Sequence, residues 1–145
     1  MFSLFSPKKR ILRVYPLGTT YNLQEIMHAI NQEYFEGKLS LPITWWGNPL
    51  RVARTKRTLG SYHFATGLIR IHRMLDHPHF PSYFISYIVY HEMLHHLLPP
   101  LKRKVRGRRS HHAQFCAKER EFRDFARARE WEKQHRTYGL RYGRP

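Results

Sequence analysis

The sequence has almost no cysteine and no long apolar run. Cys116 is the single cysteine among 145 residues, which excludes an intrachain disulfide and a zinc ribbon built on CxxC pairs. No apolar stretch approaches the roughly 18 residues that a membrane span needs. The N-terminal stretch MFSLFSPKKR places its basic residues after a short apolar run, unlike a secretory signal. We therefore expect a cytoplasmic protein without a membrane partner; a nucleoid-associated or nuclear location is also compatible.

Acidic residues are scarce as well. Ten Asp and Glu stand against 26 Lys and Arg, which gives a formal net charge of +16. Such an excess favours an anionic partner, DNA before an acidic membrane surface. The alternative is a solvated basic surface that has no specific ligand. The candidate nucleic-acid contacts in the segment LKRKVRGRR are Lys102, Arg103, Lys104, Arg106, Arg108 and Arg109.

The composition predicts a folded single domain. An apolar fraction of 41% and an aromatic fraction of 14% are enough for a packed interior and exclude a disordered chain. Neither a repeat nor a long linker divides the sequence. We expect one domain over residues 1–145, present as a monomer, whose core spans about 20–135 between a basic lead-in and a C-terminal tail.

The first half of the chain predicts a helix followed by strands. Apolar residues recur at helical spacing in TTYNLQEIMHAINQEYFEGKL, where Asn22 suits the N-cap and Gly37 the helix end. The stretches ITWW and LRVAR favour strands, and TLGSYHFATGLIRIHRML predicts two strands around a turn at 65–67. Ile69 and Ile71 then share one face of the second of these strands.

The second half predicts two helices. A segment over about 82–98 is apolar on nearly all sides, so we expect it to be the buried central helix, which the prolines at 99–100 end. A last helix should begin with Ser110 as N-cap and continue to about residue 135. Its expected apolar face comprises Phe115, Phe122, Phe125 and Ala126. The element order predicts an α+β fold, a small, mostly antiparallel sheet packed against three helices.

The central helix carries an H-E-x-x-H pattern formed by His91, Glu92 and His95. Residues i and i+4 differ by about 40° around a helix, so both imidazoles share a face and can bind one Zn²⁺. Glu92, next to the first histidine, can act as general base on a zinc-activated water. Because a buried charge is costly unless it is compensated, the pattern favours a metal site over satisfied polar residues of the core.

A catalytic zinc site usually takes three protein ligands and keeps one position open. The downstream candidates for the third ligand are His111, His112, Glu119 and Glu121. Spacing by itself leaves this choice open. The adjacent His96 points about 100° away from His95, so we expect it to be partly exposed or to lie behind the ligands.

Three segments occur in a characteristic order, namely AINQEYFEGKLSLPITWW, YHEMLHHLL and HHAQF. Together they resemble the SprT-like (Spartan-type) zinc metallopeptidase family. In that family a helix ends in Asn-x-x-Tyr-Phe-x-Gly-x-Leu and precedes a Trp-bearing strand, and H-E-M-hydrophobic-H and His-Gly-x-x-Phe follow. The resemblance covers roughly residues 20–125, and His112 stands where the family has glycine.

This resemblance implies a zincin-like fold, a zinc cofactor and hydrolysis of peptide bonds in a protein or peptide substrate. It selects His111 as the third zinc ligand beside His91 and His95, because the family histidine stands four residues before a phenylalanine, here Phe115. It gives Glu92 the role of the catalytic base. Family members act on proteins crosslinked to DNA, so the implied substrates are DNA-associated proteins.

The charge also allows a different function, a non-catalytic nucleic-acid-binding module with a structural zinc. Trp45, Trp46 and Tyr62 are candidates for stacking on bases, although we expect at least one of the two tryptophans in the core. In a peptidase, Tyr62, His63 and Arg70 lie near the expected edge strands and are candidates to stabilise an oxyanion. A peptide substrate is expected to add as a strand along the sheet edge.

Overall fold

The structure is a computed structural model that describes residues 11–50, 58–102 and 110–135. Its helices are α1 (Leu23–Phe35), α2 (Ser82–Leu97), α3 (Ala113–Glu119) and α4 (Phe125–Gln134), with a 3-10 helix at Arg73–Leu75. Its strands are β1 (Ile43–Trp46), β2 (Gly60–His63) and β3 (Leu68–His72). The expected α+β class is confirmed. In the described part of the chain, no helix combines the length and apolarity needed to cross a membrane.

The sheet is mixed rather than mostly antiparallel. Its strand order is β1-β3-β2, in which β3 pairs antiparallel with β2 and parallel with β1. The β2–β3 hairpin agrees with the expected turn, where Gly67 has a φ of 72°. Alternating side chains predict a strand but not its partner, so the parallel pairing could not be read from the sequence. The strand expected at LRVAR falls largely on residues 51–57, outside the described residues.

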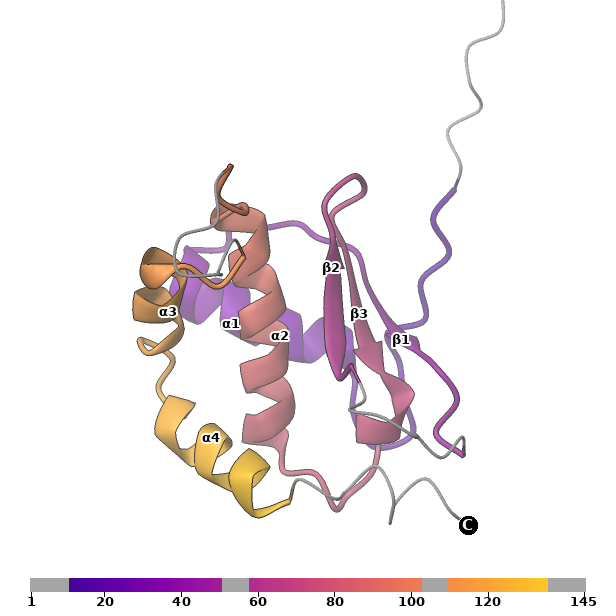
Figure 1. Ribbon diagram of the computed structural model, residues 1–145. Coiled ribbons are helices and arrows are strands. Elements are labelled where there is room, and N and C mark those ends of the chain that lie inside the picture. Colours follow the sequence, from indigo (N-terminus) through magenta and orange to yellow (C-terminus); the bar gives the residue numbers. More distant parts are fainter. Residues whose placement is uncertain (1–10, 51–57, 103–109, 136–145) are drawn as a thin grey trace, which may run out of the picture.

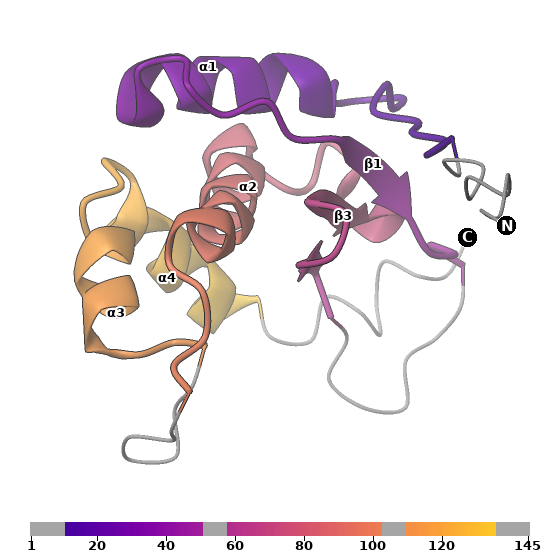
Figure 2. The ribbon, with the colours of Figure 1, turned by 90° about the horizontal axis from the view of Figure 1, so that it is seen from above.

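Helix α2 is the central element of the fold. Figure 1 shows it between the sheet on one side and α3 and α4 on the other, and Figure 2 shows α1 across α2 and β1. Ten of its 16 residues are buried, including Val89 and Met93, as expected for a helix that is apolar on nearly all sides. Ile69 and Ile71 of β3 are fully buried and contribute to the same core.

The end of α1 explains part of the family motif. The buried Asn31 side chain accepts a hydrogen bond from the Leu39 backbone N–H at 3.0 Å and donates one to the Leu39 carbonyl at 2.6 Å. Glu36 and Gly37 both adopt positive φ angles, 54° and 72°, which end the helix. The Asn31 side chain therefore fixes the turn that leads toward β1. At the other end, the expected cap is present, because Asn22 accepts a hydrogen bond from the Gln24 N–H.

The last expected helix is in fact two helices, and this changes which residues are buried. The chain turns between α3 and α4, where the Arg123 backbone N–H donates to the Tyr34 hydroxyl at 3.0 Å. Phe122 is buried at this turn against the Tyr90 ring. The turn shifts the phase of α4, so Ala128 is buried and Ala126 is exposed, contrary to the expected apolar face. The expected N-cap at Ser110 is also wrong, because His112 caps α3.

Candidate metal centre

Three imidazoles converge beside α2. His91 and His95 lie one helical turn apart on α2, and His111 lies two residues before the start of α3. One possible ligand atom from each residue lies within 4.8 Å of the others. We call these three residues the histidine cluster. The structure thus brings together the three residues that the sequence analysis expects as metal ligands, from two segments that Pro99, Pro100 and the basic segment separate in the sequence.

The spacing of the nitrogens fits a zinc ion. The Nε2 atoms of His95 and His111 are 3.2 Å apart. Two nitrogens bonded tetrahedrally to one zinc ion at roughly 2.0–2.1 Å lie about 3.3 Å from each other. Burial and the neighbouring His91 and His111 lower the pKa of His95 to about 4, so its ring is neutral at pH 7. Neutral imidazole is the form that binds metal.

The other candidates for the third ligand lie elsewhere. His112 is buried, and its Nδ1 accepts a hydrogen bond from the Phe115 N–H at the start of α3. Glu121 forms an exposed ion pair with Lys118. His96 is exposed, and its Nδ1 lies 2.8 Å from the hydroxyl oxygen of Tyr62. The geometry therefore favours His111, the residue that the family resemblance selects.

Glu119 has a different position from the one that a ligand would take. One of its carboxylate oxygens lies 3.6 Å from Nδ1 of His91, and the other accepts a hydrogen bond from the Tyr87 hydroxyl. Burial by itself would raise the pKa of Glu119, but its interactions with His91 and Tyr87 hold it below its usual value. A carboxylate at Nδ1 leaves Nε2 of His91 available to a metal and orients the ring.

The sequence contained a signal for this arrangement. Tyr87 stands four residues before His91, so helical spacing places both on one face of α2. The position of Glu119 depends instead on how α3 packs against α2. The sequence therefore predicts Glu119 only as a candidate ligand. It does not predict that Tyr87 and Glu119 lie behind His91.

Glu92 is buried beside the cluster, with 6% of its surface exposed. Burial raises the pKa of its carboxyl to about 7, although the charge of His91 acts in the opposite direction. The strand β2 passes very close to it, since a Cβ on Gly60 would lie 3.0 Å from both Glu92 Oε1 and Ile88 Cγ2. Glycine at position 60 thus lets the strand approach the carboxyl group.

The remaining sequence candidates are spread over the sheet. The Tyr62 hydroxyl contacts His96 of α2. The guanidinium carbon of Arg70 instead lies 4.8 Å from the centroid of the Trp46 ring. His63 contacts the turn through Thr66. Of the two tryptophans, one is in the core as expected, since Trp45 is buried and Trp46 is 42% exposed. Among the three oxyanion candidates, Tyr62 contacts the helix that carries the cluster.

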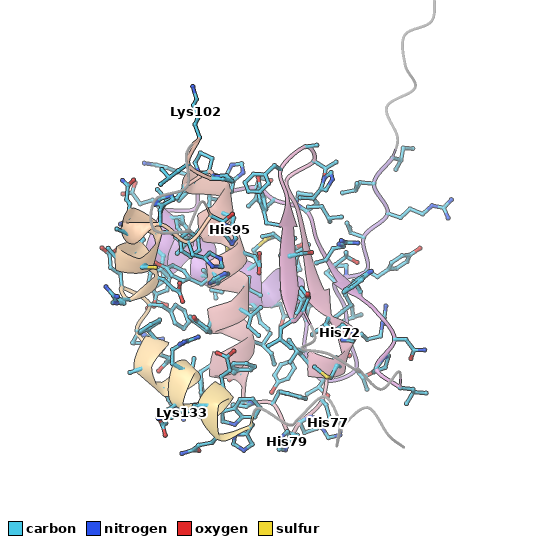
Figure 3. All side chains as sticks on the ribbon, viewed as in Figure 1. His72, His77, His79, His95, Lys102 and Lys133 are labelled. Carbon is cyan, nitrogen blue, oxygen red and sulfur yellow. The ribbon has the colours of Figure 1, made fainter. Side chains whose placement is uncertain are left out.

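The basic segment is described only at its beginning. Lys102 is exposed and extends away from the body of the protein beyond the C-terminal end of α2 (Figure 3). The other candidate nucleic-acid contacts lie outside the described residues; they are Arg103, Lys104, Arg106, Arg108 and Arg109.

Fold and cluster together define a small α+β protein in which two imidazoles of the central helix and a third from the segment before α3 could hold a metal ion. The chain belongs to the SprT-like family, whose model matches residues 23–135. Among solved structures, the metallopeptidase zymogen jannalysin of Methanocaldococcus jannaschii is similar in fold, with a TM-score of 0.54 at 16% identity. The alignment covers 87% of this chain and 96% of the jannalysin chain. No curated protein matches the chain.

Proposed function

We propose that this protein is a zinc metallopeptidase of the H-E-x-x-H type. The observation that carries the proposal is the convergence of the histidine cluster beside the buried carboxyl group of Glu92. His91, Glu92 and His111 also line a cavity. Membership of the SprT-like family and the likeness in fold to a metallopeptidase zymogen support it. A structural zinc usually has four protein ligands, whereas the group found in the described residues has three.

The roles of the residues follow from their positions. His91, His95 and His111 would hold the zinc ion, which would serve as the Lewis acid for a peptide carbonyl and lower the pKa of water toward neutral pH. Glu92 adjoins the first of these histidines, where it can take the proton of the attacking water and deliver it to the leaving amine. The strand β2 is terminal in the described sheet and packs against α2, so it offers its backbone to an extended peptide.

The test is the substitution Glu92→Gln, which keeps the size of the side chain and removes the base. We expect kcat to fall by roughly 10²–10⁴-fold, while elemental analysis still finds one zinc per chain. Glu130→Gln is a matched control, because Glu130 is exposed on α4. Proteolysis that survives in the Glu92→Gln protein with zinc bound would refute the mechanism.

The substrates in this proposal are DNA-associated proteins, which the net charge of +16 supports. We expect the affinity for DNA to fall by roughly 10³-fold between 50 and 200 mM salt if about six phosphates are contacted. An absence of DNA binding near physiological salt would remove DNA from the proposal and leave the peptidase untouched. A protein that binds zinc and DNA but cleaves no peptide would instead be the non-catalytic module.

A further inference from the structure

The two faces of the sheet differ in what they carry. One face packs against α1 and α2 and contributes four buried residues to the core, namely Ile43, Trp45, Ile69 and Ile71. In Figure 1, α2, α3 and α4 all lie on one side of the sheet. Because side chains alternate along a strand, Trp46 of β1 and Arg70 of β3 lie on the opposite face. This outer face is therefore separate from the histidine cluster.

The exposed indole ring of Trp46 has two neighbours that fix its position. The guanidinium carbon of Arg70 lies 4.8 Å from the ring centroid, which is a cation–π contact. The buried His72 ring meets the indole edge-on, with centroids 5.6 Å apart. Gly47 makes room for His72, since a Cβ at position 47 would lie 2.6 Å from its Nε2. The indole is thus an ordered aromatic surface, and we call Trp46 and Arg70 the Trp46 platform.

The guanidinium group of Arg70 is positioned but not neutralised. Its Nε donates a hydrogen bond to the hydroxyl of Ser61, the residue opposite Arg70 on β2, at 3.4 Å. The ion pairs of the described residues do not include Arg70. A planar guanidinium beside an aromatic ring can stack on a nucleobase and pair with a phosphate. The Trp46 platform therefore offers both an aromatic face and an uncompensated positive charge.

The charge around the Trp46 platform has one sign. Residues 37–75, which include the whole described sheet, contain seven Lys or Arg and neither Asp nor Glu. All ten acidic residues of the chain fall within residues 25–36 and 76–132. A polyanion that approaches the sheet therefore meets positive charge without repulsion from carboxylates on the strands.

A second exposed ring lies beside the strand that carries Trp46. The Tyr15 backbone is bound to β1, because its N–H donates to Thr44 Oγ1 at 2.9 Å and its carbonyl accepts the Trp45 N–H at 3.1 Å. The Tyr15 side chain is exposed, and Arg13, two residues earlier, adds an exposed positive charge. The same edge of the sheet thus presents two aromatic side chains and two cations, which suits successive nucleotides of one strand.

We propose that the Trp46 platform binds single-stranded DNA, with an unpaired base stacked on the indole and a neighbouring phosphate paired with Arg70. This inference rests on the proposed association with DNA and not on the peptidase reaction. Bases inside a duplex keep their faces stacked on one another, so the platform favours single strands over duplex. DNA bound on the outer face of the sheet leaves the histidine cluster on α2 open to a peptide.

The first experiment compares DNA forms on the full chain loaded with zinc. Fluorescence anisotropy measures the affinity for a labelled oligo(dT) of about 12 nucleotides and for a duplex of the same length. We expect the single strand to bind at least about 10-fold more tightly. Equal or tighter binding of the duplex would overturn the proposal. Displacement of oligo(dT) by polyglutamate or by anionic phospholipid vesicles, as effective as displacement by unlabelled oligo(dT), would also overturn it.

Variants at Trp46 test whether the indole stacks on a base. Trp46→Ala should weaken binding of oligo(dT) by about 10-fold or more, and the salt dependence should stay unchanged because the indole contacts no phosphate. Oligo(dT) should quench the tryptophan fluorescence of the wild-type protein. Trp46→Phe keeps a ring and should retain most of the affinity but lose this quenching. Leu50→Ala is the matched control, because Leu50 is exposed and apolar but has no aromatic ring.

Arg70→Ala tests the phosphate contact at the Trp46 platform. We expect weaker binding and a slope of log affinity against log salt that is shallower by about 0.7, the value for one phosphate contact on a single strand. An unchanged slope in Arg70→Ala would overturn the assignment of a phosphate to Arg70. Zinc content and melting temperature confirm that each variant is folded.

The outcomes separate this inference from the proposed function. If the wild-type protein binds DNA and the Trp46→Ala and Arg70→Ala proteins bind it equally well, the platform is wrong and the association with DNA stands. Equal losses in Trp46→Ala and Leu50→Ala would also refute a stacked base. If the wild-type protein binds no DNA, the platform and the DNA association fail together, and the peptidase is untouched. A loss in Trp46→Ala with none in Leu50→Ala supports the platform.

Discussion

Two histidine-rich groups lie at opposite ends of α2, and they use the same residue type differently. His95, in the histidine cluster, lies toward the C-terminal end of α2, whereas His77 and His79 precede its N-terminus (Figure 3). In this second group, the His135 ring stacks on Trp131 with centroids 4.2 Å apart, and His79 packs edge-on against His135. His77 joins them through its Nδ1, which accepts a hydrogen bond from the His79 backbone N–H, and we call His77, His79 and His135 the stacked group. Imidazole rings bring their nitrogens together in one place and form an aromatic packing surface in the other.

The direction of the ring nitrogens makes the difference. Among the described residues, the histidine cluster is the group of possible ligand atoms that gathers closely enough to hold a metal. It also has the carboxylate of Glu119 behind one ring. In the stacked group, burial and the neighbouring His135 and His77 lower the pKa of His79. A count of histidines in the sequence could not have separated these two arrangements, because it contains no information on ring orientation.

The largest effect is expected from removing a histidine of the histidine cluster, and the removal of a histidine of the stacked group is its control. His91→Ala should reduce the zinc content from one per chain to none, and His79→Ala should leave it unchanged. Zinc at 100 times its Kd should stabilise the wild-type protein by about 2.7 kcal/mol, and this gain should vanish only in His91→Ala. Elemental analysis and thermal unfolding with and without chelator measure both quantities. Loss of zinc in His79→Ala alone would reverse the assignment of the two groups.

A smaller effect is expected from replacing the carboxylate of Glu119, which lies behind His91 in the histidine cluster. Glu119→Gln should weaken zinc binding by about 10–100-fold, because the amide is a poorer acceptor for the Nδ1 proton of His91. Tyr87→Phe should weaken it less, since Glu119 keeps its contact with His91. Competition with a chromophoric chelator measures the affinity without reference to activity. Glu121→Gln is the control, and equal affinities in the Glu119 and Glu121 variants would contradict the role of Glu119.

The smallest effect concerns the pH dependence of stability in the stacked group. The pKa of His79 in the folded protein lies below its ordinary value of 6.5, so the unfolded chain binds its proton more readily. The contribution of His79 to the free energy of unfolding should therefore be complete above pH 6.5 and be lost as the pH falls through that value toward the pKa of the folded state. In metal-free protein, His79→Gln should make the fall in Tm between pH 8 and 5.5 smaller by about 1–2 °C. An unchanged pH profile in this variant would show that His79 does not contribute.

The helices and the hairpin were predictable because their causes are local. The spacing of Leu23, Met27 and Ile30 follows one helix face, and all three are buried. The interruption between α3 and α4 was not predictable, since residues 120–124 contain neither glycine nor proline. The chain turns there because Phe122 packs against aromatic rings of α1 and α2, and because the Tyr34 hydroxyl accepts the Arg123 N–H. Both contacts join residues that are far apart in the sequence.

The sequence by itself determined the local half of the candidate site. Because α-helical geometry is fixed, the spacing of His91, Glu92 and His95 places two imidazoles on one face and a carboxyl group beside them. The tertiary structure decided what depends on how the helices pack around α2. It places Nε2 of His111 at 3.2 Å from Nε2 of His95 and puts Glu119 behind His91. Distances between separate elements arise from side-chain packing across the core, which no local pattern specifies.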